Sequence, residues 1–276
     1  ILGAQGLASV IGSSHSVAHA YVRLYIENGG KYFTHAHVDK ILVENGHAKG
    51  IRLADGTEIE AKKLVLTDVD PWQLVNNLID KEHLNDRILR KIKTLKSGKN
   101  ALAWYTWALN EPIEFKAANH NPDVNEVGQL GLCSLDPFIW VREYHTRMMG
   151  QVPPVEGTLL WHCYAEPDRK ARVISGNGIT YLTEQFVPPA PALTEAQWLT
   201  FKKQHIEDVI REVNHYAPNM TWDNIIGVAP DTPYDTAQRL INMPFGDWAV
   251  LDWDHWRPRN MRPITEFAFH KIHNIK

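Results

Sequence analysis

The chain has 276 residues, of which 44% are hydrophobic, and its formal net charge is −3. That size and composition suffice for a buried core in one large domain or two modest ones. A charge so close to zero argues against nucleic acid as a partner, because phosphate-backbone binding needs a basic face. No apolar run approaches the roughly 20 residues that are needed to cross a bilayer.

The two cysteines, Cys133 and Cys163, form no C-x-x-C motif. We therefore expect reduced thiols in the core of a cytoplasmic protein, with a single disulfide as the alternative.

The first predicted element is an amphipathic helix that begins near Ser14. Ser14 can act as its N-cap, and Gly29 with Gly30 supplies the positive-φ conformation that commonly ends helices. Apolar residues recur between these ends at helical spacing: Val17, Ala18, Tyr21, Leu24 and Tyr25.

A β-rich ribbon follows the helix. A short strand is expected at residues 31–33. Residues 38–44 and 48–53 flank Asn45-Gly46, a dipeptide that fits a type I′ turn. Because the twist of that turn matches the twist of two paired strands, these residues predict a β-hairpin.

The ribbon continues to a carboxylate-rich corner. A turn at Asp55-Gly56 leads to a strand at residues 57–60, and the continuous apolar run at 63–66 predicts a buried strand of the parallel type. Asp70 and Pro71 then predict the N-cap and first position of a new helix.

The residues of this ribbon also follow a recognisable sequence pattern. From Val38 to Pro71 the chain reads V-x-x-I-x-x-E-x-G-x-A-x-G-I-x-L-A-D-G-T-x-I-x-A-x-x-L-V-L-T-D-x-D-P. Over residues 12–72 the chain resembles the phytoene dehydrogenase-like, carotenoid desaturase group of FAD-dependent oxidoreductases, which is related to the flavin amine oxidases.

The resemblance implies a cofactor role for the ribbon. In such flavoproteins the residue at the position of Val38 offers its backbone N–H and C=O to the adenine of FAD. Thr67 and Asp68 follow the expected buried strand, where ligands of open α/β sheets gather, so they are expected near the nucleotide. The alternatives are that Val38 is strand core and that Asp68 belongs to a turn.

Two further FAD motifs of this group are not found in the sequence. The Gly3–Gly6 segment lacks the spacing of G-x-G-x-x-G and a preceding strand. The glycine-rich segment that binds the ribityl-phosphate side is expected beyond Lys276. The resemblance therefore implies a central fragment, for which a second chain could supply the missing FAD-binding segments.

The remainder of the chain suits a substrate-binding domain. Strands are expected at residues 101–109, 157–166 and 178–187, and a long helix capped by Thr194 is expected before Pro218. Further helices are expected around residues 74–80, 84–95 and 137–149. The predicted fold class is α/β in a mixed α+β form, in which a partial FAD-binding fold with a β-hairpin or meander (1–80) is joined to a mixed sheet covered by helices (81–240) and a return segment (241–276).

Several large side chains are candidate walls of a substrate pocket, although at such spacing they can equally be plain core. They are Trp104, Phe138, Trp140, Met148 and Met149.

The chain has 14 histidines. His15 lies where members of the group carry a glycine-rich turn beside the substrate cavity, so it is the candidate catalytic residue, and a solvent-exposed helix histidine is the alternative. Spaced histidine pairs, such as His15 with His19 or His35 with His37, lack a third ligand at a recognised spacing, so no metal site is predicted.

The resemblance implies an FAD-dependent oxidoreductase that moves a hydride from a C–C or C–N bond of a hydrophobic small molecule to the flavin. A peripheral membrane contact is compatible with such a substrate. The alternative is a non-catalytic substrate-binding or assembly module that has the same fold but no bound flavin.

Overall fold

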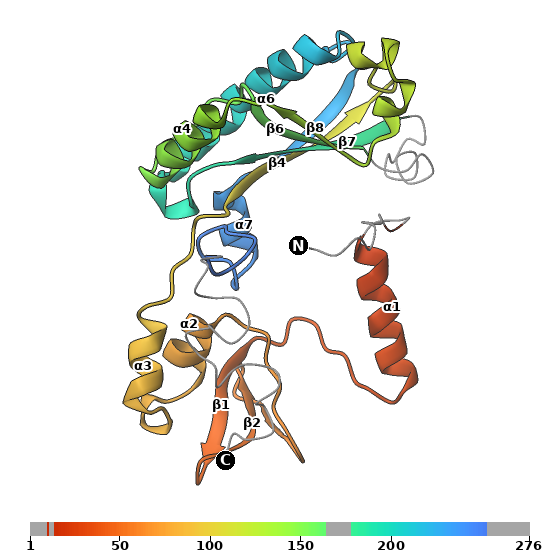
Figure 1. Cartoon of the computed structure of the whole chain (residues 1–276). Coiled ribbons are helices and arrows are strands. Elements are labelled where there is room, and N and C mark those ends of the chain that lie inside the picture. Colours follow the sequence, from red (N-terminus) through yellow and green to blue (C-terminus); the bar gives the residue numbers. More distant parts are fainter. Residues whose placement is uncertain (1–9, 11–13, 164–177, 253–276) are drawn as a thin grey trace.

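The structure is a computed structural model that describes residues 10, 14–163 and 178–252. Its strands form two separate sheets, one of three strands near the start of the chain and one of five strands. Figure 1 shows the five-stranded sheet beneath the helices α4 and α6, with the smaller sheet at the opposite end of the molecule.

Helix α1 (Ser14–Glu27) confirms the first predicted helix. Ser14 lies in its first turn instead of preceding it as a cap. Gly29 ends the helix with φ 84°, and the backbone N–H of Gly30 donates to the carbonyl of Tyr25. None of its residues is buried, and the short strand expected at residues 31–33 does not form.

The three-stranded sheet is an antiparallel meander in the order β1 (Val38–Glu44), β2 (His47–Leu53) and β3 (Glu58–Glu60). Asn45 (φ 51°) and Gly46 (φ 76°) both have positive φ, as the type I′ turn requires, so the predicted hairpin is confirmed. Strand β1 is an edge of this sheet.

The predicted buried strand at residues 63–66 is wrong. These residues are not a strand, and the side chains of Leu64 and Leu66 are exposed. A parallel strand is stable only between partner strands, and no strand in the described part of the chain pairs with this run.

The helix predicted after this run does begin at Asp70. The buried Asp70 carboxylate accepts the backbone N–H groups of Trp72 and Gln73 at 3.0 Å. Short elements follow, and their apolar residues form a small core around Val75, Ile92 and Leu95. They are α2 (Pro71–Gln73), a π-helical turn (Leu74–Leu78), a 3-10 turn (Lys81–His83) and α3 (Asp86–Ile92).

The five-stranded sheet runs in the order β5, β6, β7, β4, β8, and all of its pairings are antiparallel. Its strands are β4 (Leu102–Leu109), β5 (Gln129–Cys133), β6 (Thr158–Cys163), β7 (Ile179–Phe186) and β8 (Ile225–Asp231). The fold class of helices combined with sheets is confirmed, whereas the sheet expected to be mixed is antiparallel.

Helices and short turns connect these strands. They are 3-10 turns at Lys116–Asn119, Pro122–Glu126 and Ala190–Ala192, and the helices α4 (Pro137–Met148), α6 (Glu195–Tyr216) and α7 (Pro233–Arg239). None of the helices in the described ranges is long and apolar enough to span a membrane.

The main core lies between the five-stranded sheet and α6. A capping box between Thr194 and Gln197 begins α6, and its buried residues, which include Trp198 and Val209, pack on one face of the sheet. Buried aromatic side chains dominate this core, and the indole N–H of Trp107 donates to Thr183 Oγ1 at 2.9 Å.

Two passages of the chain meet at the start of β4. Ala101 pairs with Asp247 in an isolated antiparallel bridge. The buried Asp247 carboxylate accepts the backbone N–H groups of Gly98 at 2.7 Å and Asn100 at 3.2 Å. The buried Asp252 carboxylate accepts the N–H of Lys99 at 3.1 Å. Residues 97–101 and 247–252 are therefore tied to each other.

Candidate functional site

The five-stranded sheet has one face that α6 does not cover. Strand residues alternate between faces, so Tyr105 and Trp107 enter the core whereas Trp104 points the other way. On β6 and β7, the core takes Trp161 and Tyr181. The opposite side chains define what we call the open face: Trp104, Thr106, Leu160, His162, Leu182, Glu184 and Phe186.

The open face carries a histidine–carboxylate pair among apolar side chains. His162 Nε2 lies 3.0 Å from Glu184 Oε2, and the exposed fractions of the two side chains are only 20% and 17%. Glu184 stands directly across from Leu160 on β6 and from Trp104 on β4, and His162 stands across from Leu182. Sequence reasoning missed this pair, although both residues interrupt apolar runs at open-face positions of predicted strands.

Trp104, a predicted pocket residue, lies on this open face with 36% of its surface exposed. It stands between Glu184 on β7 and Asp231 on β8. Asp231 pairs with Arg239 and accepts the hydroxyl of Thr236 at 3.1 Å. Its charge is thus already compensated, which leaves the His162–Glu184 pair as the polar centre of the face.

The structure places Val38 at the first position of the edge strand β1, where it is half-buried. Its neighbour His37 accepts the backbone N–H of Ala54 through its carbonyl. An edge strand presents main-chain donors and acceptors along its outer side. This edge therefore fits the backbone contact that an adenine ring requires.

Thr67 and Asp68 lie in the exposed loop before Asp70. The Thr67 hydroxyl accepts the backbone N–H of Val69 at 3.3 Å, which forms a local turn. Because the strand expected before them is absent, these residues do not stand at the end of a strand. Their role at the nucleotide stays a prediction.

The other predicted pocket walls lie on α4. Phe138, Met148 and Met149 are exposed, and the half-buried Trp140 donates its indole N–H to the carbonyl of Ser134 at 3.1 Å. The buried side chains of α4 are instead Glu143 and Arg147, which lie 2.7 Å apart. Burial raises the pKa of the Glu143 carboxyl, and the Arg147 guanidinium opposes that shift.

His15 lies on α1, with its ring exposed and 4.2 Å from that of His19 between centroids. His35 and His37 do not alternate on a strand as predicted, because His35 has φ 56° in a bend before β1. Within the described ranges, no three side chains of His, Cys, Asp or Glu gather as metal ligands.

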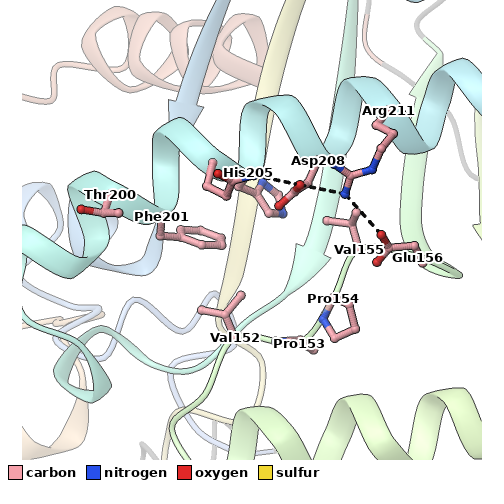
Figure 2. A pocket seen from close by; sticks show the side chains of 11 residues that line it. Val152, Pro153, Pro154, Val155, Glu156, Thr200, Phe201, His205, Asp208 and Arg211 are labelled. Carbon is pink, nitrogen blue, oxygen red and sulfur yellow. Dashed lines mark hydrogen bonds and ion pairs between the residues drawn. The ribbon is translucent and has the colours of Figure 1, made fainter.

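A pocket of about 480 Å³ lies on the other side of the sheet, between α6 and the segment before β6 (Figure 2). Buried His205 forms part of its wall, and burial lowers the pKa of this imidazole to about 4. Arg211 at its rim pairs with Asp208 at 2.8 Å and Glu156 at 3.3 Å. The lining residues are Val152, Pro153, Pro154, Val155, Glu156, Thr200, Phe201, Gln204, His205, Asp208 and Arg211. None of the predicted site residues is among them.

Comparison with curated proteins finds partial similarity to enzymes of carotenoid metabolism, whereas no family model matches. The chain is 30% identical over 61 residues to a 4,4'-diapophytoene desaturase (4,4'-diapolycopene-forming) of Methylomonas sp, which covers 22% of this chain and 12% of that protein. It is 32% identical over 90 residues to a phytoene desaturase (neurosporene-forming) of Rhodobacter capsulatus, which covers 28% and 17%. It is also 30% identical over 79 residues to a chloroplastic prolycopene isomerase of Daucus carota, which covers 29% and 13%. The matches thus span less than a fifth of each relative.

Among solved structures, an oxidoreductase from Methanosarcina mazei shares the fold. It matches 80% of this chain and 43% of its own chain, with a TM-score of 0.51 and 17% sequence identity. The likeness extends over more of this chain than the sequence matches do, and it covers less than half of the other chain.

Proposed function

Because this chain is a relative of the carotenoid desaturase-like oxidoreductases, we propose that it supplies the adenine edge and the substrate face of an FAD-dependent oxidoreductase. The reaction proposed is transfer of a hydride from a hydrophobic substrate to the flavin. The observation that carries this proposal is the sequence similarity to two desaturases and an isomerase at 30–32% identity.

The edge of β1 at Val38 would hold the adenine through its main-chain atoms. Backbone groups at an edge lack a strand partner on their outer side, so a purine can replace water there without breaking the sheet. FAD, when bound, supplies the acceptor for the hydride.

The open face would hold the substrate. Its apolar members Leu160, Leu182 and Trp104 offer a surface from which water is readily displaced, and the sheet beneath them is rigid because the packed core supports its other face. A rigid apolar wall orients a long substrate and keeps water away from the bond that reacts.

A proline at position 38 tests the adenine edge. Val38→Pro removes one backbone N–H at the first residue of an edge strand, a position that tolerates proline. We expect the affinity for FAD to fall about three- to tenfold, because one hydrogen bond contributes about 0.5–1.5 kcal/mol net. Fluorescence titration of FAD measures the change. Val38→Leu, which keeps the amide, should bind FAD like the wild type, and equal affinity in the proline variant would contradict the assignment.

The visible spectrum of the purified chain tests the function as a whole. Flavin absorbance, or uptake of added FAD, supports the proposal. A colourless chain that takes up no FAD speaks against activity of this chain alone and favours the second candidate, a binding or assembly module.

The surface of α1 can distinguish the two candidates, because this helix exposes apolar side chains and buries none of its residues. They are Val17, Tyr21, Leu24, Tyr25 and Ile26. We propose that a further FAD-binding segment covers this surface. Capture of a dinucleotide-binding chain in a pull-down supports that arrangement, and binding of apolar ligands without such a chain favours the module.

A further inference from the structure

The His162–Glu184 pair lies within the face proposed to hold the substrate. Its neighbours across the strands are Leu160, Leu182 and Trp104, so the pair is a polar spot among large apolar side chains. The other carboxylate of this face, Asp231, already forms an ion pair with Arg239 and accepts a hydrogen bond from Thr236. A substrate that lies flat on the face therefore covers Glu184.

Covering the pair with a pure hydrocarbon is unfavourable. The Glu184 side chain is still 17% exposed, and a hydrocarbon that covers a carboxylate removes its access to water without replacing the hydrogen bonds. His162 lies near Glu184 Oε2. No other side chain or backbone donor in the described ranges bonds the carboxylate, so none of these residues occupies Oε1.

We infer that the substrate is an apolar molecule that carries a hydrogen-bond donor, a hydroxyl or an amine, which Glu184 accepts. This inference rests on the proposed function, since it takes the open face as the substrate site. His162 is assigned a positioning role, because its Nε2 lies 3.0 Å from Glu184 Oε2 across the two strands.

Two isomeric probes test this inference on the purified chain in the presence of added FAD. Dodecan-1-ol carries a donor, whereas 1-methoxyundecane has the same atoms and only an acceptor. Their dissociation constants are measured by displacement of the neutral dye Nile red. In Glu184→Gln we expect the preference for the alcohol over the ether to fall about tenfold relative to the wild type, because a hydrogen bond to a charged group is lost.

Two matched variants complete the test. Glu156→Gln makes the same chemical change on the opposite side of the sheet and should leave the preference unchanged. Leu182→Ala should weaken both probes by a similar factor, because it removes apolar contact from the open face. A preference that stays within twofold of the wild type in Glu184→Gln overturns the inference, as does a Leu182→Ala variant that binds both probes normally.

The visible spectrum separates this inference from the proposed function. A protein that holds FAD but shows no effect of Glu184→Gln retains the oxidoreductase assignment and loses the inferred donor. A protein that prefers the alcohol through Glu184 but takes up no FAD loses the oxidoreductase assignment and keeps a donor-selective binding face.

Discussion

At the scale of single residues, Gln185 determines which ring nitrogen of the buried His205 carries the proton. Its amide nitrogen donates to the carbonyl of Pro154 at 2.8 Å and to Thr158 Oγ1 at 3.1 Å. Its amide oxygen therefore faces His205 Nε2 at 2.7 Å and must accept a hydrogen bond from the N–H group there. Nε2 of His205 therefore carries a proton, and because burial lowers the pKa of the imidazole to about 4, the ring is neutral at pH 7.

This histidine makes stability depend on pH. The unfolded chain binds the proton near pH 6.5, whereas the folded protein does so only near pH 4, so the unfolded state gains protons first and stability falls as the pH drops between these values. From pH 7 to pH 5 we expect His205 to lower the free energy of unfolding by about 2 kcal/mol.

Urea denaturation at the two pH values measures this loss. His205→Gln should remove most of the difference, whereas His120→Gln, a change at an exposed histidine, should retain it. An equal pH dependence in the wild type and in His205→Gln would show that His205 does not titrate as described.

At the scale of elements, the hairpin depends on the conformation of its turn. Gly46 has φ 76°, and a Cβ placed on it meets no atom within 4 Å. A substitution there therefore changes backbone strain without a clash. Gly46→Ala should destabilise the protein by about 1 kcal/mol, because an L-residue with a Cβ disfavours this region.

Thermal or urea unfolding checks this expectation. Gly128 also has open space around it but has no positive φ, so Gly128→Ala is the matched control and should change stability little. Similar losses in the two variants would contradict the turn assignment.

The sequence predicts elements well where the signals are local. The turn at Asn45-Gly46, the cap at Asp70 and the capping box that begins α6 each depend on neighbours within four residues, and all three form. The strand expected at residues 63–66 needed partner strands, which a local apolar run cannot guarantee. Strands β5 and β8 were not predicted, because Gly131 and Pro230 interrupt their strand patterns.

The candidate site was predicted only in part. Val38 and Trp104 lie on an edge strand and on the open face, and their roles stay predictions. The His162–Glu184 pair depends on the register between β6 and β7, which joins residues far apart in the chain and leaves no spacing motif. A site formed by register requires the three-dimensional structure.

At the scale of the whole molecule, the junction at residues 97–101 and 247–252 rests on two buried carboxylates. Asp247 bonds the N–H groups of Gly98 and Asn100 and also that of Ala249 at 2.8 Å. Asp247→Asn replaces one acceptor oxygen by an NH₂ group that faces these donors. We expect a loss of about 2–3 kcal/mol in the free energy of unfolding, because hydrogen bonds to a charged group are lost and donors are left unpaired.

Chemical denaturation of Asp247→Asn measures this loss. Asp223→Asn, a change at an exposed aspartate, should cost less than about 0.5 kcal/mol. A junction variant as stable as that control would show that the carboxylate does not hold the two passages together.

The pairing of Ala101 with Asp247 also bears on how such a protein can diversify. The segment between these two residues begins and ends at the same place in the fold, as an inserted domain does. A segment whose two ends are adjacent can be exchanged or altered in evolution while the path of the flanking chain is preserved. If the open face holds the substrate as proposed, chimeras that exchange residues 101–247 between relatives are expected to transfer ligand preference without redesign of the remainder.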